Sequence, residues 1–338
     1  CSRILSGRRR MCRGWCELQY FIHSFNKKVE ISSAEFSKLT KARSELSLQR
    51  SIEVLFDLLA HSYLEFERLL LNNAFDYASY KDNGYFTSDK IDESETKINV
   101  FMLSLLQTAT FYIEQTKSQL KKIDANFKVQ FETQLNKTYD ENIEFRVMQQ
   151  LRNIAIHGNS ELVQLSFGNR REYEKEGDME SPARTRIVND PRVSITTILS
   201  NKKTKRLLRV ELEEISKDFS HIDLKYFTRQ YIRLLFLAHQ EIRRITEPSF
   251  DLATQSILDL VDFLASNDFD RNGHFFLAQE TDTDRFKRSV DTHFVNHIKQ
   301  KRENWVNLDG TLVRYVSNEI HLNHRVFIPK ETEIFIPR

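Results

Sequence analysis

The sequence predicts a mainly α-helical fold, and three observations support this prediction. Glycine and proline, which interrupt helices, are scarce, with 8 Gly and 5 Pro among 338 residues. Apolar side chains recur at steps of three and four residues in several long segments, as they do on one face of a helix. Apolar residues form 40% of the chain and charged residues 29%, which is typical of a folded protein with an apolar core.

Two long amphipathic helices are predicted in the first half of the chain. The first begins at Ser47 and weakens at Tyr80, before the turn residues of segment 81–84. Its apolar face consists of Ile52, Leu55, Phe56, Leu59, Tyr63, Phe66 and Leu70. The second helix follows a group of acidic residues, which favour a helix start, and ends near Lys122. Its apolar face consists of Ile98, Phe101, Met102, Leu105, Leu106, Ala109, Tyr112 and Ile113.

A third helix is predicted from about Asp140 to His157, and Gly158 follows it in the place where glycine commonly ends a helix. Its inner face consists of Ile143, Val147, Leu151 and Ile154. Further on, two helices are expected at 223–246, where Pro248 stops the first, and at 252–265. The charged segment between the third helix and these two is expected to be a loop or hairpin that leads to a short strand-like run at 193–199.

The end of the chain changes character, with a helix near 291–303 and then short strands. These predicted strands are 312–316, 325–328 and 333–336. In chain order we expect a basic and polar N-terminal arm (1–46), a helical bundle (47–165), a charged loop (166–200), additional helices that pack on the bundle (201–268) and a mixed α/β region (269–338).

Charge and cysteine content indicate a cytoplasmic protein without a membrane segment. No apolar run approaches the roughly 18–20 residues that span a bilayer, and the basic start is followed by residues too polar for a signal peptide. All three cysteines precede residue 17, which fits a reducing compartment. The net charge of +2 neither requires nor excludes a polyanionic partner.

The most informative segment lies at the end of the third helix, where Arg152 and Asn153 precede His157. Cations are also stabilising at helix ends, so a purely structural role is an alternative. Asn153 and His157 lie one turn apart, whereas Arg152 lies about 140° from His157 on an ideal helix. The Arg152 and His157 side chains converge if the helix ends near His157. Arg146 and Gln149 share the polar face with His157.

These residues resemble the HEPN superfamily, whose helical bundles carry Arg, then usually Asn, Asp or His, then His after four to six intervening residues. Here Arg152 is followed by Asn153, three further residues and His157. The run from Phe145 to Leu151 and the two long helices before it are also similar to this family. The resemblance covers about residues 47–165.

The resemblance implies a metal-independent endoribonuclease without a cofactor, in which two copies of the motif form one composite site in a homodimer. His157 would transfer protons to or from the 2′-hydroxyl or the leaving 5′-oxygen. Arg152 would stabilise the charge of the phosphorane, and Asn153 would position the backbone, the phosphate or His157. It further implies RNA as the substrate, a role as a toxin or anti-phage defence effector, and an antitoxin or activator protein as partner.

Four residues near the motif are expected to bind the RNA backbone: Arg146, Gln149, Arg170 and Arg171. The basic cluster at 202–206 is a more general candidate, and its alternative is a solvated turn.

Histidines and carboxylates elsewhere suggest weaker metal-site alternatives, and we expect no metal. His293 and His297 are four residues apart on a predicted helix, but no acidic residue lies between them as in metalloproteases. The other groups are His321 with His324, Cys12 and Cys16 with His23, and Glu280 with Asp282 and Asp284. The last group lacks the glycine and final glutamate of a calcium loop.

The chain has no Walker phosphate loop, dinucleotide-binding turn or Gly-x-Ser-x-Gly motif, so kinase, dehydrogenase and α/β-hydrolase activities have no support. Two hypotheses remain: the ribonuclease, and a non-catalytic helical module of HEPN type that binds a partner protein or a nucleotide.

Overall fold

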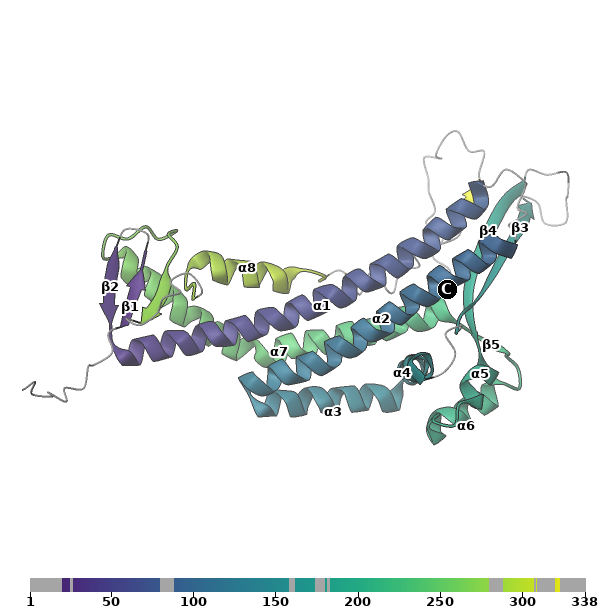
Figure 1. Cartoon of the computed structure of the whole chain (residues 1–338), viewed down its shortest axis with the longest axis horizontal. Coiled ribbons are helices and arrows are strands. Elements are labelled where there is room, and N and C mark those ends of the chain that lie inside the picture. Colours follow the sequence, from purple (N-terminus) through teal and green to yellow (C-terminus); the bar gives the residue numbers. More distant parts are fainter. Residues whose placement is uncertain are drawn as a thin grey trace, which may run out of the picture. The chain divides into compact units, whose positions relative to one another are not determined.

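A computed structural model describes residues 20–24, 27–79, 88–157, 162–173, 180, 183–279, 288–306, 308 and 320–322. It is mainly α-helical, which confirms the predicted fold class (Figure 1). The chain divides into two compact units, each made of separate stretches of sequence. Unit 1 comprises Cys1–Arg50 and Glu247–Arg302, and unit 2 comprises Ser51–Thr246 and Glu303–Arg338. This division differs from the five consecutive segments that we predicted, because two helices contribute to both units.

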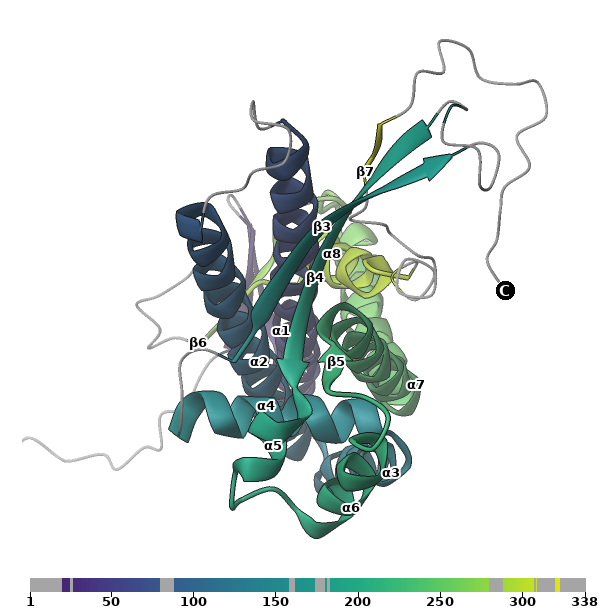
Figure 2. The ribbon, with the colours of Figure 1, turned by 90° about the vertical axis from the view of Figure 1, so that its right-hand side faces the viewer.

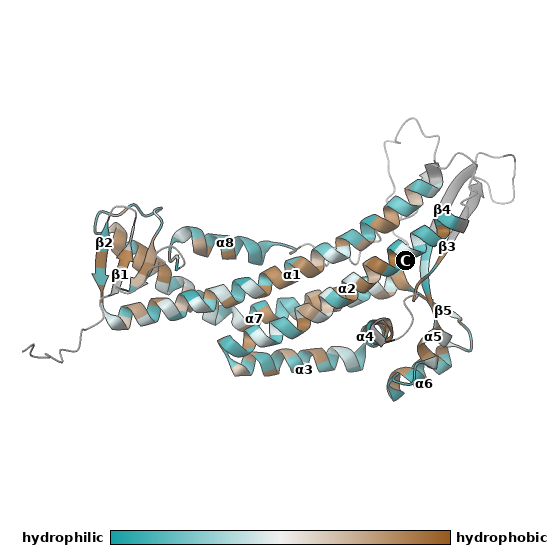
Figure 3. Ribbon diagram, in the orientation of Figure 1, coloured by the Kyte–Doolittle hydropathy of each residue, from teal (hydrophilic) through white to brown (hydrophobic). Residues whose placement is uncertain are grey.

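Those two helices are α1, Ser33–Ser79, and α7, Leu224–Ala265. Hydrophobic and hydrophilic residues alternate along the helices, as expected for amphipathic segments (Figure 3). Among the described helices, none is long and apolar enough to cross a membrane. The other helices are α2 (Ser88–Ile123), α3 (Ala125–Glu141), α4 (Ile143–His157), α5 (Ile195–Ser200), α6 (Arg206–Ile215) and α8 (Thr292–Glu303).

Each unit has a small antiparallel sheet. In unit 1, the strand order is β2 (Lys28–Ile31), β1 (Tyr20–His23) and β6 (Phe276–Gln279). In unit 2, β3 (Gln164–Tyr173) and β4 (Ala183–Ser194) form a long hairpin, in which Gln164 pairs with Arg192 and Tyr173 with Ala183 (Figure 2). The same sheet contains β5 (His221–Asp223) and β7 (Ile320–Leu322), which both pair with β4.

The N-terminal arm that we predicted is wrong from Tyr20 onward. Strands β1 and β2 occupy part of it, and α1 begins at Ser33 instead of Ser47. The start of α1 is a capping box: the Ser32 backbone N–H donates to Glu35 Oε2 at 3.0 Å, and the Glu35 N–H donates to Ser32 Oγ at 3.2 Å. This Ser-x-x-Glu pattern is readable from the sequence.

Other differences concern segments with short apolar patterns. Helix α3 was not predicted, and α5 and the end of β4 replace the predicted strand at 193–199. The charged segment, by contrast, agrees with one of its two predicted forms, because β3 and β4 pair as a hairpin. Helix α7 continues through Pro248, because the apolar period resumes at Phe250 and Ile257, which are buried in unit 1. The predicted strands 312–316, 325–328 and 333–336 lie outside the described residues.

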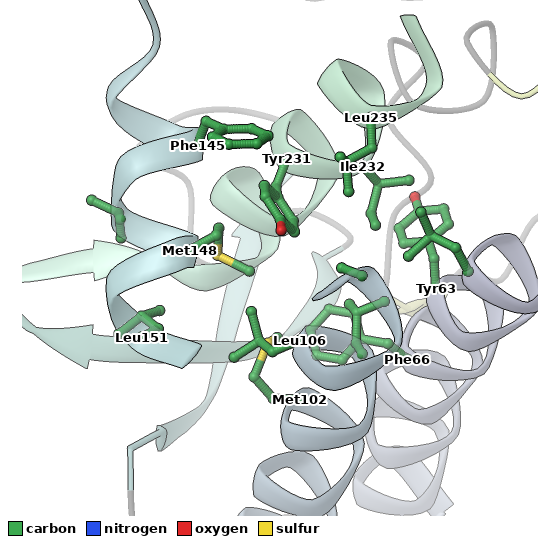
Figure 4. Close-up of a cluster of buried hydrophobic side chains, with 14 of the residues drawn as sticks. Tyr63, Phe66, Met102, Leu106, Phe145, Met148, Leu151, Tyr231, Ile232 and Leu235 are labelled. Atoms are coloured by element: carbon green, nitrogen blue, oxygen red, sulfur yellow. The ribbon is translucent and has the colours of Figure 1, made fainter. Parts of the chain in front are cut away.

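The core of unit 2 is formed by side chains from α1, α2, α4 and α7. Figure 4 shows Phe66 of α1 close to Leu106 of α2, with Met148 of α4 and Tyr231 of α7 completing the cluster. All four are nearly inaccessible to solvent, and Phe145 packs against Tyr231 at 5.1 Å between ring centroids. Full burial of each large apolar side chain contributes about 1.5–3 kcal/mol. The predicted bundle therefore also requires α7. Unit 1 has a separate core, in which Ile22, Leu39, Ile257, Phe275 and Ile298 are buried.

A buried charge network also links α1 to α7 within unit 2. His239 is fully buried, and its Nε2 lies 3.1 Å from Glu53 Oε2, while Arg243 donates to the same oxygen at 2.6 Å. The other His239 nitrogen lies 3.0 Å from the Tyr112 hydroxyl, and its ring stacks on Phe56 at 4.1 Å. Burial alone raises the pKa of Glu53, but the charge of His239 and hydrogen bonds from His239 and Arg243 outweigh it and hold the pKa at about 2.

We predict that Glu53→Gln lowers the free energy of unfolding by about 3–5 kcal/mol, because it removes the carboxylate that forms the buried ion pair with Arg243 and hydrogen-bonds to His239. The folded pKa lies below the unfolded value of 4.5, so the contribution of Glu53 is complete above about pH 4.5 and is lost as pH falls towards 2. Denaturant unfolding between pH 7 and pH 2 should therefore show a shallower loss of stability in Glu53→Gln than in wild type. Glu65→Gln, an exposed carboxylate on the same helix, is the control; equal effects of the two substitutions would contradict the prediction.

Candidate functional site

The candidate site lies on the polar side of α4, whose apolar side is fixed in the unit 2 core. Val147, Leu151 and Ile154 are buried, as predicted, and Ile143 is partly buried. Leu151 points into the core next to Met148 (Figure 4). Because this face is fixed, the residues on the adjoining faces of α4 have defined positions.

Arg152 and Asn153 are both half-buried and in direct contact. Arg152 Nη1 donates to Asn153 Oδ1 at 3.0 Å. The Nε of Arg152 is buried and has no hydrogen-bond partner among the described residues. Tyr231 lies close enough that the charge of Arg152 opposes the increase in the Tyr231 pKa that burial causes. The guanidinium is thus held by Asn153 without being neutralised by a described carboxylate.

His157 is the last residue of α4, so its backbone lies where the sequence predicts. Its side chain and Gly158 lie outside the described residues, and the convergence of Arg152 with His157 stays a prediction. The chain resumes at Leu162, where Asn99 of α2 fixes it. Asn99 Oδ1 accepts hydrogen bonds from the N–H groups of Leu162 and Val163, both at 3.0 Å. The backbone is therefore held both before and after the end of the motif, and we did not predict this role of Asn99.

Arg146 has a structural role, and the prediction that it binds RNA is wrong for this conformation. Its side chain is buried and donates to the carbonyls of Tyr139 and Asp140, at 2.6 and 2.7 Å, and to Glu211 at 2.6 and 3.1 Å. Those two carbonyls belong to the last turn of α3, where carbonyl groups have no N–H donor within the helix. Arg146 therefore caps α3 and joins it to α6.

Gln149 faces a cleft of about 360 Å³ between α2, α3 and α4. It also donates to the Tyr231 hydroxyl at 2.9 Å. The Lys205 ammonium, at the start of α6, lies 4.3 Å from the centre of the Tyr139 ring and borders the same cleft. The residues that line the cleft are Thr110, Ile113, Glu114, Lys117, Leu135, Asn136, Tyr139, Phe145, Gln149 and Lys205. The basic cluster was predicted from the sequence, but its contact with the Tyr139 ring was not.

Arg170 and Arg171 lie on β3, opposite Arg186 and Thr185 of β4, and their side chains are outside the described residues. No described group of three or more His, Cys, Asp or Glu residues could hold a metal ion. His293 hydrogen-bonds to the Asn272 carbonyl at 2.9 Å, and His297 is exposed. The remaining metal-site alternatives fall wholly or partly outside the part of the chain that the structure describes: Cys12, Cys16, His23, Glu280, Asp282, Asp284, His321 and His324.

We predict that Arg146→Ala lowers the free energy of unfolding by about 2 kcal/mol, because it leaves two helix-end carbonyls and Glu211 without their donor. Arg146→Lys should recover only part of this loss, since an ammonium lacks the planar donor fork. Chemical denaturation measures the effect, with Lys137→Ala, an exposed residue of α3, as the control. A wild-type stability for Arg146→Ala would show that the cap is unimportant.

Comparison of the chain with known proteins gave no match to a protein-family model, a curated protein or a solved structure.

Proposed function

We propose that the chain is a metal-independent endoribonuclease of HEPN type, with Arg152 and His157 as catalytic residues. The proposal rests on the hydrogen-bonding surroundings of Arg152. Its guanidinium is oriented by Asn153, its buried Nε has no described partner, and it lies on the same helix as His157. An oriented cation that retains donors is suited to a pentavalent phosphorane, whose negative charge grows in the transition state.

The proposed reaction is attack of the RNA 2′-oxygen on the adjacent phosphorus. The bond from phosphorus to the 5′-oxygen breaks, and the products are a 2′,3′-cyclic phosphate and a 5′-hydroxyl. A proton leaves the 2′-hydroxyl and another reaches the 5′-oxygen, and His157 transfers one of them because imidazole titrates near neutral pH. DNA is not a substrate because it lacks the 2′-hydroxyl.

The proposal includes a homodimer, in which a second copy of Arg152 and His157 supplies the other half of the site. Two histidines then divide the roles of base and acid. By analogy with the family that the motif resembles, the protein acts in the cytoplasm as a toxin or an anti-phage effector, and an antitoxin or activator controls it. The alternative is a non-catalytic module of the same fold that binds a nucleotide or a protein.

We expect His157→Ala to reduce RNA cleavage by at least about 100-fold while the protein stays folded, since proton transfer contributes 10²–10⁴-fold. Arg152→Ala should cause a loss of about 10²–10³-fold, and Arg152→Lys should restore little of it. Cleavage is measured in EDTA with labelled RNA, and the product ends are analysed for a 2′,3′-cyclic phosphate.

His297→Ala, which changes an exposed histidine of α8, is the matched control and should cleave as wild type does. The ribonuclease proposal is contradicted if EDTA-treated wild type degrades no RNA with or without cell extract as a source of activator. Full activity of His157→Ala would also contradict it. Binding of RNA or nucleotide without cleavage would favour the non-catalytic alternative.

A further inference from the structure

The cleft beside α4 has the composition of a site for a phosphate-bearing ligand. Lys117 and Lys205 border it from opposite elements, α2 and the start of α6, and Gln149 and Asn136 add amide groups. Lys117 is paired with Glu114 at 2.9 Å, whereas Lys205 contacts the Tyr139 ring and forms no ion pair with a described residue. An aromatic ring attracts an ammonium without neutralising it or accepting its ordinary hydrogen bonds, so Lys205 retains N–H donors for an anionic ligand.

The positive charge extends beyond Lys205. Four of the five residues at 202–206 are basic and exposed, and none of these four forms an ion pair with a described residue. Lys205 is the N-cap residue of α6, and its side chain makes no capping hydrogen bond. The partial positive charge at the N-terminal end of this helix therefore adds to the charge of the four basic side chains. Such an unneutralised group favours a polyanion over a neutral ligand or a cation.

The size and place of the cleft favour a nucleotide within a strand. A volume of about 360 Å³ exceeds what one inorganic phosphate requires and lies within the range of small-molecule sites. Gln149 precedes Arg152 and Asn153 by about one turn on α4. A strand that occupies the cleft and follows α4 towards its C-terminal end would therefore reach the residues proposed to be catalytic.

We propose that this cleft binds a nucleotide of single-stranded RNA, with Lys205 and Lys117 at its phosphates. The choice of RNA rests on the proposed function. Aromatic and basic side chains together are the usual means of binding a single strand without reading its sequence. The cleft would place the neighbouring phosphate near Arg152.

Lys205→Ala tests the proposal, with Lys217→Ala as the control: Lys217 is an exposed lysine that pairs with Glu214, lies outside the basic group at 202–206 and does not line the cleft. The probe is a fluorescent 2′-O-methyl ten-residue single strand, which cannot be cleaved, and anisotropy gives its dissociation constant at several salt concentrations. We expect Lys205→Ala to weaken binding about 3–10-fold and to reduce the slope of log affinity against log salt by about 0.7, as for one lost phosphate contact. Lys217→Ala should change the dissociation constant and the salt slope much less, and Lys117→Ala combined with Lys205→Ala should weaken binding further.

Three results would overturn the proposal: equal weakening by Lys217→Ala and Lys205→Ala, binding of a duplex as tight as that of the single strand, or no binding by wild type. If uridine monophosphate bound as tightly as the ten-residue strand and its binding depended on Lys205, the cleft would be a mononucleotide site. That result would overturn the proposal that it binds a nucleotide within a strand. Cleavage assays separate the two proposals. If wild type cuts RNA and Lys205→Ala binds the probe normally, only the cleft proposal fails. If the single strand binds in a Lys205-dependent way but wild type cleaves no RNA, only the ribonuclease proposal fails.

Discussion

The apolar face of α4 is the constraint on which the candidate site depends. Phe145, Met148 and Leu151 pack against α2 and α7 in unit 2, and this packing fixes the rotation of α4 about its axis (Figure 4). Arg152 then lies beside the buried face and not on it, which leaves it half-buried, hydrogen-bonded to Asn153 and near enough to Tyr231 for its charge to oppose the rise in the pKa of that hydroxyl that burial causes. The position of the proposed catalytic cation thus follows from side chains that have no part in the chemistry.

Buried ion pairs give unit 2 a second constraint, because α1 and α7 are joined by charges as well as by apolar contacts. Glu53 pairs with Arg243, and Glu67 pairs with Arg229 at 2.8 and 2.9 Å, all with little exposure to solvent. A shift of one helix by a turn would leave buried charges without partners, at a cost of several kcal/mol. We infer that these ion pairs fix the position of α1 along α7. Apolar contacts alone would allow several positions of one helix along the other.

Sequence periodicity predicted the helices whose buried residues recur over many turns, and it failed where few residues are buried. Within α3 only Phe131, Leu135 and Thr138 are buried, so its pattern is weak. The division into two units was not predictable, because the apolar periodicity of α1 and of α7 continues from one unit into the other. For the site, the sequence located Arg152 and Asn153, but their hydrogen bond depends on side-chain conformation. The contact of Lys205 with Tyr139 depends on tertiary structure, since these residues are far apart in sequence.

Arg146 and Arg152 show why the surroundings of a residue decide its role more than its type does. Both lie on α4 with buried parts, but Arg146 donates to two helix-end carbonyls and to a carboxylate, and it is electrostatically satisfied. Arg152 has one neutral amide as its described partner and a buried Nε without any. Burying a charge with so little compensation is costly for a folded protein, and a structural role does not require it. In the reaction that we propose, the phosphate would give the Arg152 guanidinium the anionic partner that it lacks among the described residues, and this interaction would be strongest in the anionic transition state.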